Sequence, residues 1–323
     1  MNFTPLDNNG LVEGFCVIKS IDCKTTSKGD SYLDMMLGDK DGEINAKLWR
    51  YSKEQHGEYK VNDLVKIRGS IAPYNGVDQL KVDRIRHVTE EDGVNPADFV
   101  KTAAYSGEEM FNELLKIANN FTDPELKLLV STILEDNRKN LLYWPAAYKL
   151  HHAVRGGLLY HTLSIVRLAQ KISQIYPFID EELLISGAML HDIAKLSEFE
   201  VAESGIAAGY TVSGNLLGHI VMGAMSIGKY AESLGISQKT AMLLEHMCLS
   251  HHGEPEFGAA VRPMFIEAEL LSELDLMDSR VYAMREALSA AEPDEFSGRI
   301  WALDNRKLYN HNRKDLSKNT ELF

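Results

Sequence analysis

The sequence predicts two domains, an all-β barrel in residues 1–92 and an all-α domain in residues 107–323, joined by a linker at 93–106. A length of 323 residues corresponds to about two average domains. Apolar residues recur with a period of two in the first part and with a helical period in the second. Charge divides at the same place, because the net charge of −13 splits into −1 for residues 1–90 and −12 for the remainder.

The composition excludes several classes of protein. Hydrophobic residues make up 45% and charged residues 25%, which is typical of a globular chain and not of a disordered, collagenous or coiled-coil one. Because the chain is acidic, any contact with nucleic acid has to come from a local surface. The three cysteines form no disulfide framework, and we find neither a secretory leader nor a run of about 18 apolar residues. We therefore expect a cytoplasmic protein with no membrane partner.

The first domain is predicted to be a small closed barrel. Alternating or β-type apolar runs indicate strands at 14–18, 31–37, 43–49, 61–71 and 79–86. Turn sequences separate these runs, and one short helix is expected near residues 51–58. Five short strands of this kind are typical of the OB-fold, a barrel that commonly binds single-stranded nucleic acid or oligosaccharide.

Helical periodicity extends through the second domain. A first helix is expected from about residue 107, and Asp123-Pro124 marks the start of the next, because proline is favoured at the first helical position. The expected helices then lie at about 124–139, 158–175, 181–195, 215–234, 237–249 and 262–291. No strand pattern of similar length interrupts them, which favours an all-α domain.

The barrel offers candidate contacts for nucleic acid, because OB-folds supply aromatic rings for bases and basic groups for phosphates. Trp49 ends an alternating strand on its polar side, together with Lys47. Tyr74 lies on a Pro-Tyr-Asn-Gly turn, and Arg68 is a further basic candidate. For Trp49 two roles remain open: stacking on a base, or covering the open end of the barrel.

Two groups of basic residues in the second domain are weaker candidates. The segment 299–318 carries six basic and two acidic residues, among them Arg299 and Arg306. It could guide a phosphate backbone, dock on a neighbouring subunit, or be a solvated tail. His152 and Arg155 closely precede His161 and could line the mouth of a pocket, with a structural role equally open.

Ionisable residues interrupt or cap the apolar helices at five stations. They are His161, His191-Asp192, His219, His251-His252 and Asp275. A buried imidazole or carboxylate is costly unless it is paired or bound to a metal. One such histidine is commonly a satisfied core residue, but five stations in one helical domain favour a metal site.

The residue types point to a particular chemistry. Imidazole and carboxylate ligands without thiolate suit Mn²⁺, Fe²⁺, Co²⁺ or Zn²⁺. Asp192 is the natural bridge between two ions, because a carboxylate can bridge and a neutral imidazole cannot. Two ions suit phosphodiester hydrolysis, since one activates water and both neutralise phosphoryl charge. Lys195 lies one helical turn after His191 and either faces a phosphate or is a solvated lysine at a helix end.

This ordered set, in which His191-Asp192 and Lys195 form H-D-x-x-K, resembles the HD-domain phosphohydrolase superfamily. The resemblance implies an all-α fold around a central metal site. By position, one ion would be held by His161, His191, Asp192 and Asp275. A second would be held by Asp192, His219 and His251, with His252 as the alternative ligand. The catalytic residues would be Asp192 and Lys195.

Longer motifs narrow the resemblance. Residues 156–162, 214–220 and 249–253 read G-G-L-L-Y-H-T, G-N-L-L-G-H-I and L-S-H-H-G. Together with the preceding barrel, they resemble the YhaM-type 3′→5′ exoribonucleases over nearly the whole chain. The resemblance implies metal-dependent removal of nucleotides from the 3′ end of single-stranded RNA, and of single-stranded DNA in some members. It also implies a homo-oligomer.

Two other functions use the same residues. A nucleotide or cyclic-dinucleotide phosphohydrolase needs the same metal chemistry, although its small substrate would leave the barrel without a strand to hold. A non-catalytic factor that binds single-stranded nucleic acid could keep the metal site for stability. We expect metal-dependent cleavage to separate the enzymes from the binding factor.

Overall fold

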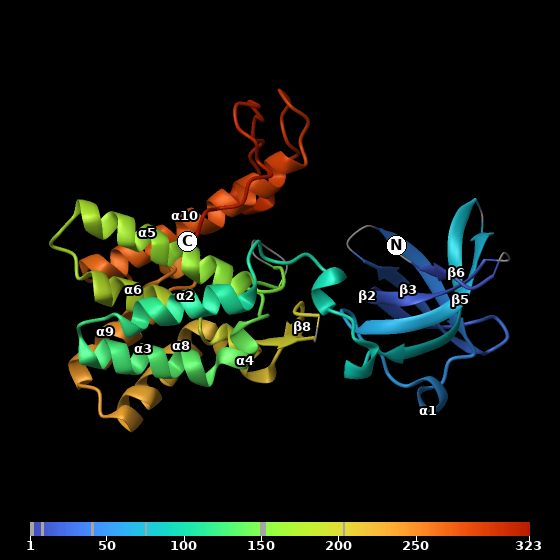
Figure 1. Cartoon of the computed structure of the whole chain (residues 1–323), viewed down its shortest axis with the longest axis horizontal. Coiled ribbons are helices and arrows are strands. Elements are labelled where there is room, and N and C mark those ends of the chain that lie inside the picture. The colour runs from blue at the N-terminus through green and yellow to red at the C-terminus, as the bar shows by residue number, and fades with distance from the viewer. Residues whose placement is uncertain (1–2, 8–9, 40–41, 75, 149–152, 203) are drawn as a thin grey trace. The chain divides into compact units, whose positions relative to one another are not determined.

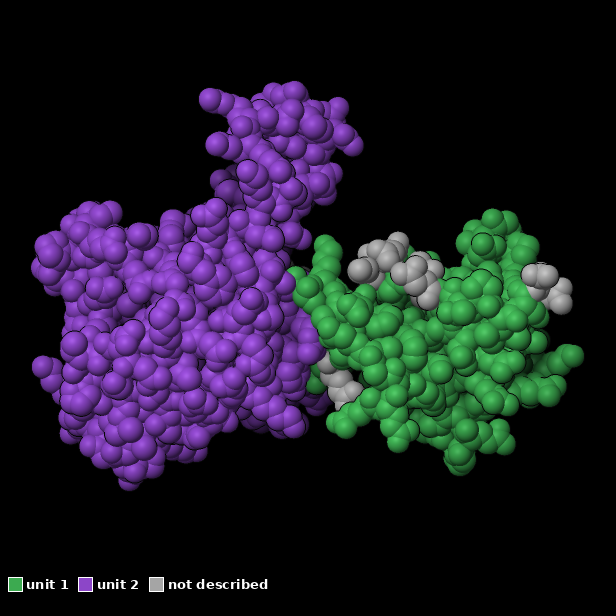
Figure 2. Space-filling model, in the orientation of Figure 1, with its two compact units in different colours: residues 1–102, 201–209 green, residues 103–200, 210–323 purple. Residues whose placement is uncertain are grey.

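The computed structural model describes residues 3–7, 10–39, 42–74, 76–148, 153–202 and 204–323. The chain forms two compact units, which Figure 2 shows in different colours. The first comprises residues 1–102 and 201–209, and the second comprises residues 103–200 and 210–323. Each unit is built around its own elements and is described in turn.

The first unit is a closed barrel of five strands with one short helix, as the sequence predicts (Figure 1). Its elements are β1 (Thr4–Pro5), β2 (Leu11–Thr25), β3 (Ser31–Gly38), β4 (Glu43–Trp49), α1 (Lys53–His56), β5 (Leu64–Tyr74) and β6 (Val77–His87). The strand order is β2-β3-β4-β6-β5, and β5 pairs again with β2 to close the barrel, while the short β1 lies beside β2. β4 and β6 run parallel, whereas the other pairs are antiparallel. This is the OB-fold.

Alternation along the strands separates the barrel's core from its surface. On β4, Ala46 and Leu48 are buried, whereas Lys47 and Trp49 lie on the outer side. The same period places Ile67 of β5 and Leu80 of β6 in the apolar core. The barrel therefore presents polar side chains on its outside and needs no buried charge.

The segment after β6 packs on the barrel for part of its length. Two short 3₁₀ helices, η1 (Glu90–Asp92) and η2 (Pro96–Asp98), lead to Phe99 and Val100, which pack with the buried Val17 and Leu64. The first unit accordingly extends to Thr102, inside the range that the sequence analysis assigned to a linker. Apolar side chains in this range explain the packing.

The second unit is predominantly helical (Figure 1). Its helices are α2 (Gly107–Asn119), α3 (Pro124–Asp136), α4 (Arg138–Leu141), α5 (Gly157–Ile175), α6 (Glu181–Leu190), α7 (Lys195–Glu198), α8 (Val212–Leu234), α9 (Gln238–Ser250) and α10 (Ile266–Ser289), with 3₁₀ helices η3 (Pro255–Phe257) and η4 (Trp301–Leu303). The start of α3 is the predicted one, because the Asp123 side chain accepts hydrogen bonds from two backbone N–H groups ahead of Pro124. No helix among the described residues is both long and apolar enough to cross a membrane.

Two features of this unit differ from the helices expected from the sequence. The helix expected at 181–195 ends at Leu190, so His191 and Asp192 lie in a turn before α7. A short hairpin of β7 (Phe199–Val201) and β8 (Ala207–Tyr210) follows α7, and its residues 201–209 are grouped with the first unit. Its strands contain three and four residues, too few for a period-two pattern to stand out.

Candidate metal centre

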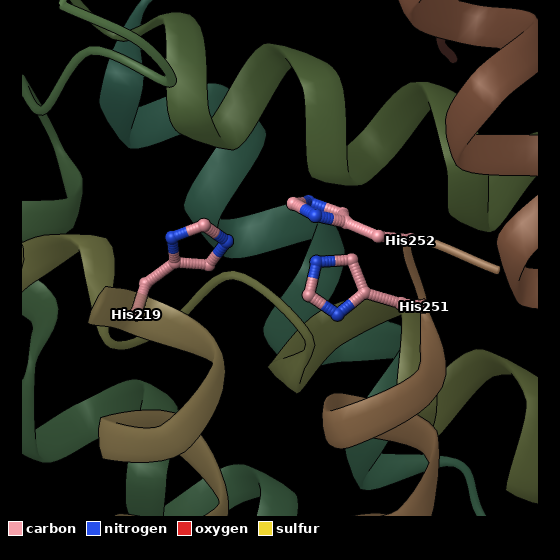
Figure 3. A group of neighbouring side chains, drawn as sticks. All are labelled: His219, His251 and His252. Carbon is pink, nitrogen blue, oxygen red and sulfur yellow. The ribbon is translucent and has the colours of Figure 1, made fainter. Parts of the chain in front are cut away.

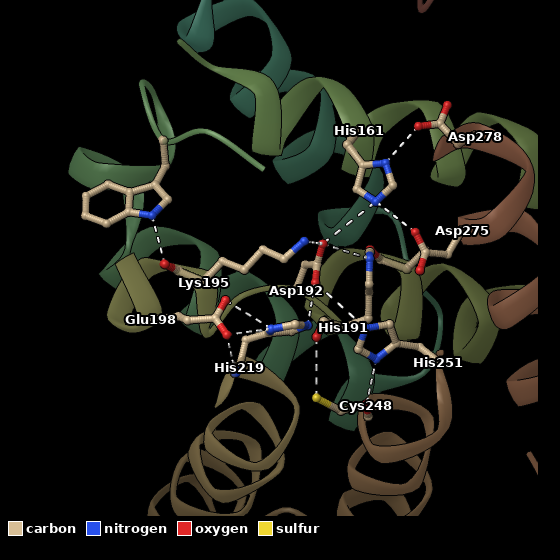
Figure 4. Close-up of polar contacts among 12 residues, drawn as sticks. His161, His191, Asp192, Lys195, Glu198, His219, Cys248, His251, Asp275 and Asp278 are labelled. Carbon is tan, nitrogen blue, oxygen red and sulfur yellow. Dashed lines mark hydrogen bonds and ion pairs between the residues drawn. The ribbon is translucent and has the colours of Figure 1, made fainter. Parts of the chain in front are cut away.

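The five stations meet in the interior of the helical unit (Figure 4). His161 lies in the first turns of α5, His219 on α8 and Asp275 on α10. His191 and Asp192 come from the turn after α6, and His251 caps the C-terminus of α9. The side-chain ligand atoms of His161, His191 and Asp192 lie within 4.8 Å of one another, as do those of His219, His251 and His252. Residues up to 114 positions apart thus form one cluster of metal-ligand types.

Asp192 lies at the centre of this cluster, and its two carboxylate oxygens face different partners (Figure 4). Oδ1 is 3.5 Å from Nε2 of His219 and 3.8 Å from Nε2 of His251. Oδ2 is 3.3 Å from Nε2 of His191 and 2.6 Å from Nζ of Lys195. One carboxylate therefore contacts both halves of the cluster.

The histidine rings are oriented by their other nitrogen. Nδ1 of His191 is 2.9 Å from the carbonyl oxygen of Ala188, and Nδ1 of His251 is 2.6 Å from that of Cys248. A carbonyl oxygen only accepts, so Nδ1 of each ring donates its proton, and in the neutral form of the ring Nε2 keeps a lone pair. Both Nε2 atoms then face Asp192.

Several of these atoms are buried without a hydrogen-bond partner among the described residues. They are Nε2 of His191, His219 and His251, and Oδ1 of Asp192. Each unsatisfied buried polar group costs about 1–3 kcal/mol. Divalent cations would accept these lone pairs, so the residues fit bound metal. The helical unit carries a cluster for divalent metal binding.

A non-helical residue within α8 orients His219. Gly218 has φ 69° and ψ 162°, a non-helical conformation that divides α8 in two and that glycine adopts without strain. The carboxylate of Glu198 then accepts hydrogen bonds from both the backbone N–H and Nδ1 of His219, each at 3.0 Å. Sequence reasoning missed Glu198, since its spacing of three residues from Lys195 is common on helices.

His161 is held between two carboxylates of α10. Its Nε2 is 3.1 Å from Oδ1 of Asp275, and its Nδ1 is 2.7 Å from Oδ2 of Asp278. Ser164 donates a further hydrogen bond to Asp278. Asp278 was also missed from the sequence, although its position one turn after Asp275 was a usable signal.

Electrostatics differ between the two halves of the cluster. Burial would lower the pKa of His161, but the hydrogen bonds that its ring donates to Asp275 and Asp278 outweigh burial and raise that pKa to about 10. Burial, reinforced by the neighbouring His191, lowers the pKa of His251 well below its ordinary value. Burial opposes ionisation of Asp192, yet Lys195 and the histidines hold its pKa well below the usual range. The carboxylate is ionised and His251 is neutral, which is the state that binds a metal.

A cavity of about 220 Å³ opens beside the cluster, lined by residues that include His161, Lys195, His252 and Asp275. Figure 3 shows the His252 ring beside those of His219 and His251. His251 is buried, whereas His252 is only partly so and its Nδ1 is 3.0 Å from the Phe257 carbonyl oxygen. Lys195, also lining the cavity, is half-buried and paired with Asp192 instead of being solvated.

The barrel brings two of its candidate contacts together. Trp49 is 42% exposed and stacks on Tyr32 of β3 with ring centroids 4.6 Å apart. The ammonium of Lys47 lies 5.2 Å from the Tyr32 ring centroid and 5.8 Å from that of Trp49. Tyr74 is 62% exposed at the end of β5, and Arg68 is exposed farther back on the same strand.

The remaining described candidates lie in the helical unit. The guanidinium of Arg155 lies over the ring of Tyr143, 5.2 Å from its centroid. Arg299 is exposed near the C-terminal end of the chain, and Nε of Arg306 donates to the backbone oxygen of Leu303 at 3.0 Å. His152 lies outside the described residues.

Comparisons with known proteins agree with this architecture. A family model described as "HD domain" matches residues 158–280. The protein named "3'-5' exoribonuclease YhaM" of Listeria welshimeri is 37% identical over 93% of this chain and 95% of its own. The Bacillus subtilis protein of that name is 36% identical over 92% and 94% of the two chains. A structure titled as a replication protein A heterotrimer bound to ssDNA matches 26% of this chain and 62% of its own, at 17% identity and a TM-score of 0.22, and adds nothing to the argument. From the identity and coverage of its relatives, this chain belongs to the YhaM family of 3′-5′ exoribonucleases.

Proposed function

We propose that this protein is a metal-dependent exonuclease that removes nucleotides from the 3′ end of single-stranded RNA, and of single-stranded DNA as a second substrate. The observation that supports it most is the set of buried, unsatisfied ligand atoms around Asp192. The names of the relatives supply the substrate class and the direction of cleavage. The homo-oligomer and the cytoplasmic location that we expect rest on the resemblance and on the three free cysteines.

In this proposal the cluster holds two divalent ions of Mn, Co, Fe or Zn. His161, His191, Asp192 and Asp275 would hold one, and Asp192, His219 and His251 the other, with His252 as the alternative to His251. The ions, when bound, would supply a Lewis acid for the phosphoryl oxygens and a lowered pKa for a water nucleophile. Asp192 suits the bridging position because its two oxygens already face the two halves of the cluster.

The other residues position these groups and the substrate. Asp278 and Glu198 hold His161 and His219 by Nδ1, and such outer carboxylates fix the ring orientation of metal-binding histidines. Lys195 sits at the cavity with its ammonium on Asp192, so it would turn to a phosphate oxygen once the Asp192 charge is shared. The ring pair of Tyr32 and Trp49 would stack on bases of the strand.

The test uses single-stranded RNA labelled at its 5′ end, with the full-length protein and Mn²⁺. We expect a ladder that shortens from the 3′ end, no cleavage in EDTA, and a rate reduced about 10³-fold or more for Asp192→Asn, since the variant loses several kcal/mol of transition-state stabilisation. Asp294→Asn, an exposed position outside the cluster, is the matched control. Intact RNA with every one of the four metals would refute the proposal. Binding of RNA without any product would favour the non-catalytic factor.

A further inference from the structure

A two-by-two array of cations lies on the outer face of the barrel, on β5 and β6. In the strand register, Lys66 stands opposite Arg86 and Arg68 stands opposite Arg84. Ile67, between the two cations of β5, is buried, so Lys66 and Arg68 point outward on the same side. Like charges directly opposite one another in a sheet are destabilising. The array is therefore a cost to the isolated barrel.

A β-bulge places Arg68 opposite Arg84 in this array. Gly69 pairs with Val82 but Arg68 pairs with Arg84, which leaves Asp83 as the extra residue of β6. In a regular ladder Arg68 would face Asp83, an attractive pair, and the bulge replaces that pair with two arginines. A Cβ on Gly69 would lie 2.2 Å from the backbone oxygen of Lys81, so the close approach of the strands here requires glycine.

Lys66 and Arg86 of the array each have an acidic partner. Arg86 makes two hydrogen bonds to Asp92, at 2.7 and 2.6 Å. Lys66 lies 3.6 Å from a carboxylate oxygen of Glu13. Arg68 and Arg84 are exposed, and neither makes an ion pair with any described residue.

A cleft of about 370 Å³ runs over this array. It is lined by Glu13, Gln55, His56, Lys66, Arg68, Asp83, Arg84, Ile85 and Arg86. The lining holds four cations against two carboxylates, in a chain whose net charge is −13. A cleft of this sign attracts an anionic ligand.

Geometry favours a chain of phosphates as that ligand. Guanidinium groups bind phosphate through two parallel N–H···O bonds. The two rows of the array are two residues apart, about 6.6 Å along a strand, so they can contact successive anionic groups. Lys81 of β6 pairs with Lys47 of β4, which continues the basic surface from β6 to the strand that carries Trp49.

We propose that the cleft around Arg68 and Arg84 binds the sugar–phosphate backbone of single-stranded nucleic acid. The bound strand continues across Lys81 to Lys47 and the Tyr32–Trp49 ring pair, so the barrel holds backbone on one pair of strands and bases on another. This inference rests on the proposed function, because the strand is the substrate of that enzyme.

The test compares two double variants in an Asp192→Asn background, which keeps the RNA intact. The first, Arg68→Gln with Arg84→Gln, removes the two arginines that face each other across β5 and β6. The control, Lys60→Gln with Lys127→Gln, removes two exposed charges that do not line the cleft. The probe is a fluorescein-labelled oligo(A) RNA of about 20 nucleotides, titrated at several salt concentrations. We expect the arginine variant to bind about tenfold more weakly at ~0.1 M salt, with the slope of log Kd against log salt reduced by about 1.4 for two lost phosphate contacts. The lysine variant should match the parent in both quantities.

The outcomes separate this inference from the proposed function. The two double variants could bind RNA with equal affinity and equal salt slope while their circular dichroism is unchanged. That result would refute RNA binding in the cleft and leave the proposed 3′-end cleavage by the native enzyme unaffected. If the arginine variant binds RNA more weakly but the native protein degrades no RNA, the proposed binding cleft stands and the exonuclease activity is refuted. Poly(L-glutamate) binding more tightly than RNA through Arg68 and Arg84 would reassign the cleft to an acidic protein partner and overturn the proposal.

Discussion

The barrel and the helical unit keep their ionisable residues in opposite places. In the barrel, the main cluster of buried side chains is apolar apart from a tyrosine hydroxyl, and the cations face outward. In the helical unit, His161, His191, Asp192 and His251 are each at most 3% exposed. The barrel thus fills its core with apolar side chains, whereas several buried polar atoms of the helical unit have no hydrogen-bond partner among the described residues.

In the barrel, the residues of the core and the candidate binding residues are different residues. In the helical unit, the candidate metal ligands are themselves part of the buried core. Unsatisfied polar atoms and a buried carboxylate cost free energy that a bound cation would recover. We therefore expect substitutions on the outside of the barrel to have little effect on folding. Substitutions or ligand changes at the Asp192 cluster should change both folding and binding.

We expect metal removal to have the largest effect, a loss of stability in the helical unit and none in the barrel. A ligand at about 1,000 times its Kd stabilises the native state by ~4 kcal/mol, so EDTA should withdraw about that much from the helical unit. Hydrogen exchange followed by mass spectrometry should show faster exchange in α5, α8 and α9, whose residues surround Asp192. Strands β2, β5 and β6 should exchange at the same rate with Mn²⁺ and with EDTA.

Magnesium at the same concentration serves as a control for ionic strength, because Mg²⁺ retains water and prefers oxygen ligands. Equal loss of protection in the strands and the helices on chelation would contradict a metal requirement confined to the helical core. No loss in either unit would contradict the metal site itself.

In metal-free protein, we expect the stability of the helical unit to depend on pH through the buried His161. The pKa of His161 is raised from 6.5 to about 10 by Asp275 and Asp278, so protonated His161 contributes stability that is fully present below pH 6.5. That contribution is lost as pH rises through about 10. We expect the free energy of unfolding in EDTA to fall between pH 7 and pH 10, measured by urea denaturation.

Asp278→Asn should flatten this slope, because it removes one carboxylate that holds the proton on His161. Asp294→Asn, which is exposed, should leave the slope of the native protein in place. A slope that is the same in Asp278→Asn as in the native protein would show that His161 is not the titrating group.

The sequence made the barrel and the ligand types predictable for a physical reason. Strands such as 43–49 alternate because one face is buried, and buried histidines and aspartates stand out in apolar helices. Pairings between side chains from different elements leave no such period. The Gly218 break, the contact of Glu198 with His219 and the placing of Arg84 opposite Arg68 depend on local backbone geometry that periodicity does not report.

A smaller effect than that of metal removal is predicted for Glu198, whose charge would act on a bound metal through His219. Glu198→Gln leaves one carbonyl acceptor and removes the negative charge, so Mn²⁺ affinity should fall about 10–100-fold, a typical cost of losing an outer carboxylate. Glu200→Gln is the matched control, because Glu200 is exposed only two residues away whereas Glu198 is buried. Isothermal titration with Mn²⁺ measures both without relying on activity. Equal affinities in the two variants would mean that the Gly218 break alone orients His219, and the helical unit would then depend on fewer buried charges than its core suggests.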